Sequence, residues 1–479
     1  MLDRSVQRRS LFRGAAAAAG LSTVGVLAGC SVGNKSAVPT KGPAPIVLQY
    51  APWGQWTEVG SDWEKFIQPG IDYFQSQPAN KGIQVQILAP TGGGGKYATE
   101  IEGGTGPDVF EDWVLAPYLS PNLVMRLDPF MQQDGIKTSL WSPGQMHALT
   151  LEEGTFFLPC YVHVDTMVVN LSNLDAMGLA YPDPEWDYQT AQQAFTNATQ
   201  TINGQRHAGF SPDYNGTSLG MSYNDTRAYA MHIFGGSVMD DTRMVCTMDA
   251  PETVQAVQWW DQLHWDGIAG PGSITSGATY QEYGSSYLLQ AFEQWGTNFK
   301  WTFYPVPKYP NGRLSFEATD YHAINAATKH PEQAWLLLKF LAAEPYWSQY
   351  CMKYLLRTPS LVSLWDQYVS VVEQVTPLAQ KVNVKYYVQA AQQWGLAGRT
   401  FKYQHAQAIS TINEALSQAM RNVGQDPTTV LTAAAQAVNA LESQYAKIAA
   451  SASGAGSSAA SSTSGSGSAS GTTTHASKA

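Results

Sequence analysis

The folded part of this chain begins with a strand, a helix and a second strand, and this order restricts its fold more than any other feature. Ile46 to Tyr50 is an apolar run after a proline-rich segment, and Ile83 to Ile87 alternates apolar residues with glutamines. Asp62 to Phe74 lies between them and has the pattern of a helix. We therefore predict that the chain starts an α/β lobe here.

Helices dominate the later part of the chain. Pro251 and Pro331 stand at helix starts, and apolar residues then recur every three or four positions. The same pattern predicts a helix around Ile409 to Leu416 and a last helix after Asp426, running to Ile448. The folded chain is therefore expected to end in helices.

Residues 1–29 have the features of an export signal. Four arginines precede Gly14 to Ala28, an uncharged run that is shorter than the roughly 20 residues a membrane-spanning helix needs. The stretch from Arg8 to Arg13 (RRSLFR) resembles the twin-arginine export motif. Leu27 to Cys30 (LAGC) resembles a lipobox, which predicts cleavage before Cys30, lipidation of Cys30 and an extracytoplasmic protein anchored to the cell membrane.

Two segments of low complexity bound the folded part. Residues 30–45 are expected to be a linker next to the lipid, and residues 451–479 are almost entirely Ser, Ala, Gly and Thr. Such a sequence cannot bury enough apolar surface to offset its ordering entropy, so we predict a flexible tail. The roughly 400 residues between them suffice for two domains.

Charge and cysteine content exclude several classes of protein. The formal charge is −10, and removal of residues 1–29, which hold four arginines and one aspartate, makes it more negative. No cluster of lysine and arginine is present, so a nucleic-acid partner is not expected. The four cysteines and nine histidines have neither a disulfide framework nor metal-ligand spacing, so no metal and no cofactor are predicted.

Aromatic residues are abundant for a chain with so few charges. It has 15 tryptophans and 24 tyrosines, with 14% charged residues. Their rings offer flat apolar faces with a polar tip, which match the C–H faces and hydroxyl groups of sugars. Any one of these rings can equally belong to the core.

Four stretches, in this order and spacing, resemble the extracellular solute-binding proteins of carbohydrate ABC importers, the family that includes maltose-binding protein. They are Gly103–Val109 (GGTGPDV), Phe157–Tyr161 (FLPCY) with Thr166–Asn170 (TMVVN), Gln294–Trp295 with Tyr304–Pro307 (YPVP), and Tyr321–Asn325 (YHAIN) with Lys329–Trp335 (KHPEQAW). The likeness extends over nearly all of residues 46–450.

The resemblance implies an α/β fold of the periplasmic-binding-protein type II class, with two discontinuous lobes joined by a hinge. Residues 46–160 with 320–355 would form lobe 1, and residues 161–319 with 356–450 would form lobe 2. The chain would cross between them near Pro159–Asp165, Ser315–Asp320 and Leu355–Ser360. A ligand would bind between the lobes and be buried as the hinge closes.

The resemblance also implies the protein's partners. These are a carbohydrate ligand and the permease subunits of an ABC importer, with the chain acting as a monomer.

Candidate ligand-binding residues are aromatic and polar side chains in loops that follow strands, where the family's contact regions fall. They are Trp53, Trp56, Glu111, Asp112, Trp113, Tyr161, His163, Asp165, Trp295, Asp320, Tyr321, Arg399 and Tyr403. Trp295 matches the family's stacking tryptophan.

Two alternatives remain open from the sequence. A secreted glycoside hydrolase also needs aromatics and acids, but its two carboxylates lie about 5 to 9.5 Å apart, and the adjacent Glu111 and Asp112 would point to opposite sides of a strand. No motif of a serine hydrolase, zinc protease or phosphate-binding loop is present, so no enzyme is predicted. A binding protein for another ligand, such as a peptide or a polyamine, is the second alternative.

Overall fold

The computed structural model describes residues 44–54, 63–90, 94–118, 123–202, 204–212, 232–270, 273–281, 287–295, 298–397, 401–402, 405–421 and 426–461. The predicted signal, the lipobox with Cys30 and most of the linker lie outside this part. So do the predicted site residues Trp56, Arg399 and Tyr403. No helix in the described ranges is long and apolar enough to span a membrane.

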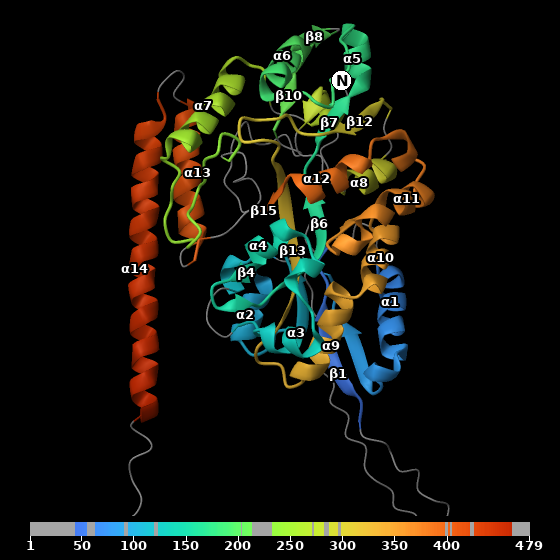
Figure 1. Ribbon diagram of the computed structural model, residues 1–479, viewed down its shortest axis with the longest axis vertical. Coiled ribbons are helices and arrows are strands. Elements are labelled where there is room, and N and C mark those ends of the chain that lie inside the picture. The colour runs from blue at the N-terminus through green and yellow to red at the C-terminus, as the bar shows by residue number, and fades with distance from the viewer. Residues whose placement is uncertain are drawn as a thin grey trace, which may run out of the picture. The chain divides into compact units, whose positions relative to one another are not determined.

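The larger sheet has seven strands in the described residues, in the order β14-β6-β13-β3-β1-β2, with β15 paired to β13 (Figure 1). Its strands are β1 (Ile46–Ala51), β2 (Ile83–Ile87), β3 (Val109–Asp112), β6 (Leu158–Val164), β13 (Ser315–Ile324), β14 (Thr358–Pro359) and β15 (Gly395–Ala397). β1, β2 and β3 are parallel, whereas β13 is antiparallel to β3 and β6. The predicted strand, helix and strand are thus present as β1, α1 (Glu64–Ser76) and β2.

Apolar periodicity explains why α1 forms where it does. Ile67, Gly70, Ile71 and Phe74 are buried and share one helix face. At Gly70 the helix approaches α10 (Pro345–Tyr354) so closely that an added Cβ would overlap the ring of Trp347. Gly70 therefore permits this contact between two helices of the main core.

Other helices and hairpins complete the part of the molecule around the larger sheet. They are α2 (Lys96–Glu102), α3 (Asp128–Asp134), α4 (Pro143–Leu149), β4 (Thr150–Leu151), β5 (Gly154–Thr155), α9 (Pro331–Ala342), α11 (Trp365–Val375) and α12 (Lys385–Gln393). The predicted helix start at Pro331 is confirmed.

A second sheet has four strands, in the order β10-β11-β7-β12. They are β7 (Met167–Asn170), β10 (Phe210–Ser211), β11 (Tyr280–Gln281) and β12 (Trp301–Tyr304), accompanied by α5 (Leu171–Met177), α6 (Tyr188–Ala198), α7 (Pro251–Trp265), α8 (Tyr287–Trp295) and the hairpin β8 (Gln200–Ile202) and β9 (Gln205–His207). Phe195, Phe210, Trp260 and Tyr280 belong to the buried cluster of this sheet. Two sheets with helices confirm the predicted α/β class.

The three segments predicted to cross between lobes are adjacent strands of the larger sheet. They correspond to β6, β13 and β14, and β6 pairs with both of the others. Backbone hydrogen bonds therefore join the three predicted crossings to one another. The lobe boundaries themselves stay a prediction.

The last two helices pack against each other and form a buried cluster with α7 (Figure 1). They are α13 (His405–Arg421) and α14 (Thr428–Ser461). Helix α14 extends to Ser461, beyond Ser451, where the predicted tail begins; the flexibility of that tail stays a prediction.

Candidate functional site

The predicted residues that follow β1 and β3 lie at the carboxyl ends of these two strands of the larger sheet. Ala51 pairs with Phe110 in parallel register, which brings Trp53 close to Glu111. The backbone N–H of Trp53 donates to Glu111 Oε2 at 3.3 Å. Trp53 and Trp113 are half-buried, and the indole N–H of Trp53 has no partner among the described residues. Two partly accessible indole rings therefore stand at the carboxyl ends of parallel strands, where ligands of open α/β sheets bind.

Asp112 has a structural role that its sequence position did not reveal. Its fully buried carboxylate accepts hydrogen bonds from the backbone of Gly94, Gly95 and Trp113 and from the hydroxyl of Tyr118. These donors fill its acceptor capacity. Asp112 therefore holds the loop before α2 and is not free to bind a sugar hydroxyl.

Glu111 points to the opposite face of β3 and is buried. Its carboxylate accepts from the hydroxyl groups of Tyr161 at 2.5 Å and Tyr50 at 3.3 Å. Burial raises the pKa of Glu111 to about 7, although these hydrogen bonds act to lower it. No lysine or arginine of the described part forms an ion pair with Glu111; His322 Nε2 lies 3.9 Å from Glu111 Oε2.

His163 and Asp320 form a close pair on two of the predicted crossing strands. His163 Nε2 lies 2.8 Å from Asp320 Oδ2, and both side chains are largely buried. A register shift in the pairing of β6 with β13 falls between Thr319 and Tyr321, at Asp320. Such bulges redirect side chains, so the irregularity explains why Asp320 can meet His163 across the two strands.

Three further predicted residues are buried at or near the same strands. Tyr161 packs edge-on against His163, and the backbone N–H of Asp165 donates to Phe316 O. Tyr321 is fully buried and its hydroxyl donates to Val114 O at 2.7 Å, so it belongs to the core. Trp295 lies at the end of α8, and the position of its side chain is outside what the structure describes.

Sequence reasoning missed a polar row beside Glu111. It consists of Tyr50, Cys160 and His322, which are all buried. Cys160 Sγ lies 2.8 Å from His322 Nδ1, and Tyr50 Oη lies 3.4 Å from His322 Nε2. No local signal marks this row, because its three members come from strands that are distant in the chain.

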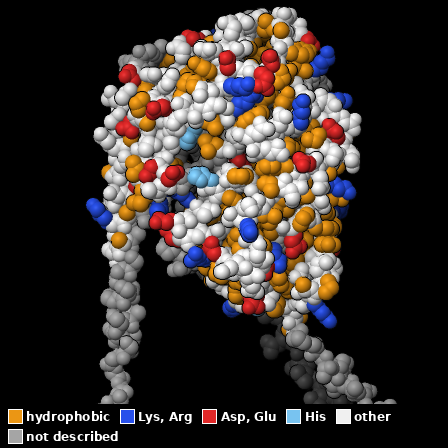
Figure 2. Space-filling model, viewed as in Figure 1, with side chains coloured by type: hydrophobic (Ala, Val, Ile, Leu, Met, Phe, Trp, Pro, Cys, Tyr) orange, Lys and Arg blue, Asp and Glu red, His pale blue; other side chains and the backbone are white. Residues whose placement is uncertain are grey.

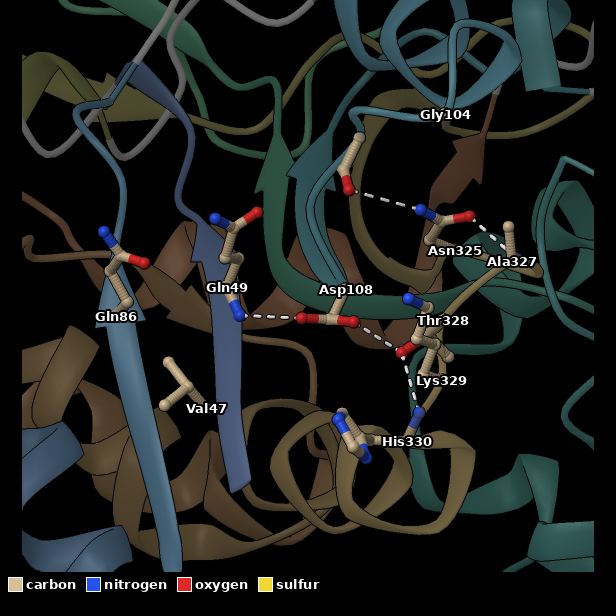
Figure 3. A pocket seen from close by; sticks show the side chains of 11 residues that line it. Val47, Gln49, Gln86, Gly104, Asp108, Asn325, Ala327, Thr328, Lys329 and His330 are labelled. Atoms are coloured by element: carbon tan, nitrogen blue, oxygen red, sulfur yellow. Dashed lines mark hydrogen bonds between the residues drawn. The ribbon is translucent and has the colours of Figure 1, made fainter. Parts of the chain in front are cut away.

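A polar pocket of about 370 Å³ lies elsewhere on the larger sheet, toward the start of β3 (Figure 3). Asp108 accepts there from the backbone N–H of Gln49 at 2.8 Å and from the hydroxyl of Thr328 at 2.5 Å. Asn325 donates to Gly106 O. The sequence motif Gly103–Val109 thus contacts the segment that holds the motifs Tyr321–Asn325 and Lys329–Trp335. The predicted ligand-binding residues near β3 lie at the other end of this strand.

The surface in Figure 2 agrees with the absence of a basic cluster from the sequence. On this face, lysine and arginine side chains are scattered among acidic and polar groups. A phosphate backbone would need a continuous basic stripe.

Comparison with known proteins yields one family and many similar folds. The sequence profile described as bacterial extracellular solute-binding protein matches residues 53–346. No curated protein sequence matches the chain.

Three solved structures illustrate the similarity of fold. An ABC substrate-binding protein from Listeria monocytogenes in complex with cycloalternan is 15% identical with a TM-score of 0.63, over 83% of this chain and 99% of that chain. The cyclic alpha-maltosyl-1,6-maltose binding protein from Arthrobacter globiformis is 14% identical with a TM-score of 0.66, over 83% and 99%. The sugar-binding protein MalE from Xanthomonas citri is 14% identical with a TM-score of 0.63, over 84% and 98%.

Proposed function

The chain belongs to the bacterial extracellular solute-binding protein family, and from this premise we propose that it binds a sugar or oligosaccharide between two lobes and delivers it to the permease of an ABC importer. The lipobox supports attachment of the mature chain to the outer side of the cell membrane through Cys30, after export by the twin-arginine route.

The observation that carries the sugar proposal is the pair of half-buried indole rings of Trp53 and Trp113 at the carboxyl ends of β1 and β3. Ring faces bind the C–H surfaces of a pyranose, and polar groups nearby bind its hydroxyls. The indole N–H of Trp53, which has no partner among the described residues, and the His163–Asp320 pair supply such polar groups. We propose that Trp295, which lies in one of the family-like motifs, supplies an aromatic ring from the second lobe.

The ligands of the solved relatives support the same class. The Listeria structure is a complex with cycloalternan, the Arthrobacter protein binds cyclic alpha-maltosyl-1,6-maltose, and the Xanthomonas protein is a sugar-binding protein. We propose that the present chain also binds a saccharide, and we expect an oligosaccharide.

The geometry disfavours the glycoside hydrolase alternative. Glu111 and Asp112 project to opposite faces of β3, where Glu111 contacts tyrosines and Asp112 holds backbone amides. Neither carboxylate is therefore placed to act with the other on one glycosidic bond. We propose that the protein binds its ligand without changing it.

A thermal-shift panel of mono- and oligosaccharides, peptides and polyamines tests this proposal. A ligand that binds only the folded chain raises the unfolding midpoint as its concentration rises. We expect a shift with at least one saccharide and none with spermidine, putrescine or short peptides. A shift with a polyamine or a peptide alone would contradict the sugar proposal and favour a binding protein for that other ligand.

A further inference from the structure

Four buried donor groups stand side by side on four consecutive strands of the larger sheet. Cys160 lies on β6, His322 on β13, Glu111 on β3 and Tyr50 on β1, and these strands are neighbours in that order. His322 pairs directly with Glu111, and Tyr50 pairs with Val109, two residues before Glu111 on the same face. All four side chains are at most 4% exposed.

The separations within this row are unusual for hydrogen bonds. Tyr50 Oη lies 3.3 Å from Glu111 Oε2 and 3.4 Å from His322 Nε2, although O–H···O hydrogen bonds are normally about 2.7 Å long. Cys160 Sγ lies 3.7 Å from His322 Nε2, which is 3.9 Å from Glu111 Oε2. One donor atom each from Glu111, Cys160 and His322 fall within 4.8 Å of one another.

These separations are close to the edges of a coordination tetrahedron. Bond lengths of about 2.0 to 2.1 Å to nitrogen or oxygen and about 2.3 Å to sulfur place neighbouring ligands roughly 3.3 to 3.6 Å apart. We propose that Glu111, Cys160 and His322 bind one zinc ion and that the Tyr50 hydroxyl completes a closed structural site. Cys160 Sγ, now 2.8 Å from Nδ1 of the imidazole, turns toward the ion on binding.

The charges of the row favour a divalent ion. A buried carboxylate is costly without a cation, and no lysine or arginine of the described chain pairs with Glu111. Imidazole nitrogen is a common ligand of zinc, and Nε2 is the ring nitrogen of His322 that faces the Glu111 carboxylate. A thiolate and a carboxylate would together neutralise Zn²⁺, and the ion itself removes the thiol proton.

The neighbouring contacts also suit such a site. Tyr161 donates to Glu111 Oε1 at 2.5 Å, which orients the carboxylate and leaves Oε2 facing His322. Thiolate, imidazole and carboxylate are the ligands that zinc prefers, whereas magnesium and calcium require oxygen donors. A bound ion would cross-link β6 and β13, two predicted crossing strands, to the parallel part of the sheet. The zinc site would therefore stabilise the strands that form the proposed hinge.

Metal analysis and cobalt spectroscopy of the full chain, purified without a histidine tag, test this proposal. After treatment with a chelator and dialysis against zinc, elemental analysis should give one zinc per chain and a higher unfolding midpoint. Replacement by Co²⁺ should give tetrahedral d–d bands together with a sulfur-to-cobalt charge-transfer band. Absence of bound metal, or a cobalt spectrum without the charge-transfer band, would overturn the proposal.

Substitutions test which side chains bind the metal. Cys160→Ser should remove the charge-transfer band, and His322→Gln should weaken zinc binding at least tenfold. The matched control is Cys246→Ser with Cys351→Ser, which removes two other buried thiols and should retain the band. A band that survives in Cys160→Ser, or is lost in the control, would refute the assignment. Because the cobalt spectrum of the unaltered chain reports the thiolate directly, the test does not depend on the folding of any variant.

Discussion

Glu317 is a buried acid whose ionisation should weaken the fold, and Glu317→Gln is the change that shows it. Ser142 donates to Oε1, whereas Oε2 has no partner among the described residues and lies against the backbones of Gly144 and Gly395. Burial raises the pKa of Glu317 to about 7, mainly because the charged form loses its hydration. In the unfolded chain the carboxyl returns to its ordinary value of 4.5.

The direction of the effect follows from proton binding. Between pH 4.5 and about 7 the folded state binds the proton more tightly than the unfolded state, so stability falls as pH rises through this window. A shift of this size corresponds to a penalty of about 3 kcal/mol above the window, at 1.36 kcal/mol per pH unit. Glutamine keeps an oxygen for the Ser142 hydroxyl and removes the ionisation.

Urea denaturation of both proteins at pH 5 and pH 8 measures the effect. The free energy of unfolding of Glu317→Gln minus that of the unaltered chain should be greater at pH 8 than at pH 5 by about 2 kcal/mol. Burial also raises the pKa of Asp261 to about 7. Because Asp261 is present in both proteins, its contribution cancels in the difference. The control Glu102→Gln, an exposed residue of α2, should change stability little at either pH. A difference for Glu317→Gln that does not depend on pH would contradict the raised pKa of Glu317.

Four other changes have specific expected outcomes. Trp53→Ala and Trp295→Ala should each weaken saccharide binding by roughly 1 to 3 kcal/mol in calorimetry while circular dichroism stays unchanged, and unaltered affinity would remove that ring from the site. Gly70→Ala should destabilise the chain by about 1 to 3 kcal/mol in urea denaturation, because the new methyl group overlaps Trp347; equal stability would show that the two helices adjust freely. Cys30→Ala should move the exported protein from the membrane fraction to the soluble fraction, and continued membrane attachment would contradict the lipobox.

Local sequence signals predicted the elements of the fold because each depends on nearby residues. The alternation of Ile83, Val85 and Ile87 gave β2, and Pro331 with its apolar stripe gave α9. Helix α14 extends to Ser461, although its apolar stripe ends at Ile448 and no apolar periodicity marks the rest of the helix.

The candidate site was harder to predict, because pairing between distant strands decides it. The position of Trp53 after a strand could be predicted from the sequence, but the loop-holding role of Asp112 depends on Gly94, Gly95 and Tyr118. The meeting of Cys160 with His322 depends on the order of β6 and β13 in the sheet. Neither residue has a ligand spacing along the chain, so the polar row could not be predicted from the sequence.

The central claim is that the chain binds a saccharide and leaves it intact. Isothermal titration calorimetry with the saccharide that gives the greatest thermal shift, followed by mass analysis of the recovered ligand, tests it most directly. We expect one saccharide per chain, weaker binding in Trp53→Ala, and a recovered ligand of unchanged mass. Absence of binding by every saccharide, or recovery of cleaved products, would contradict the account.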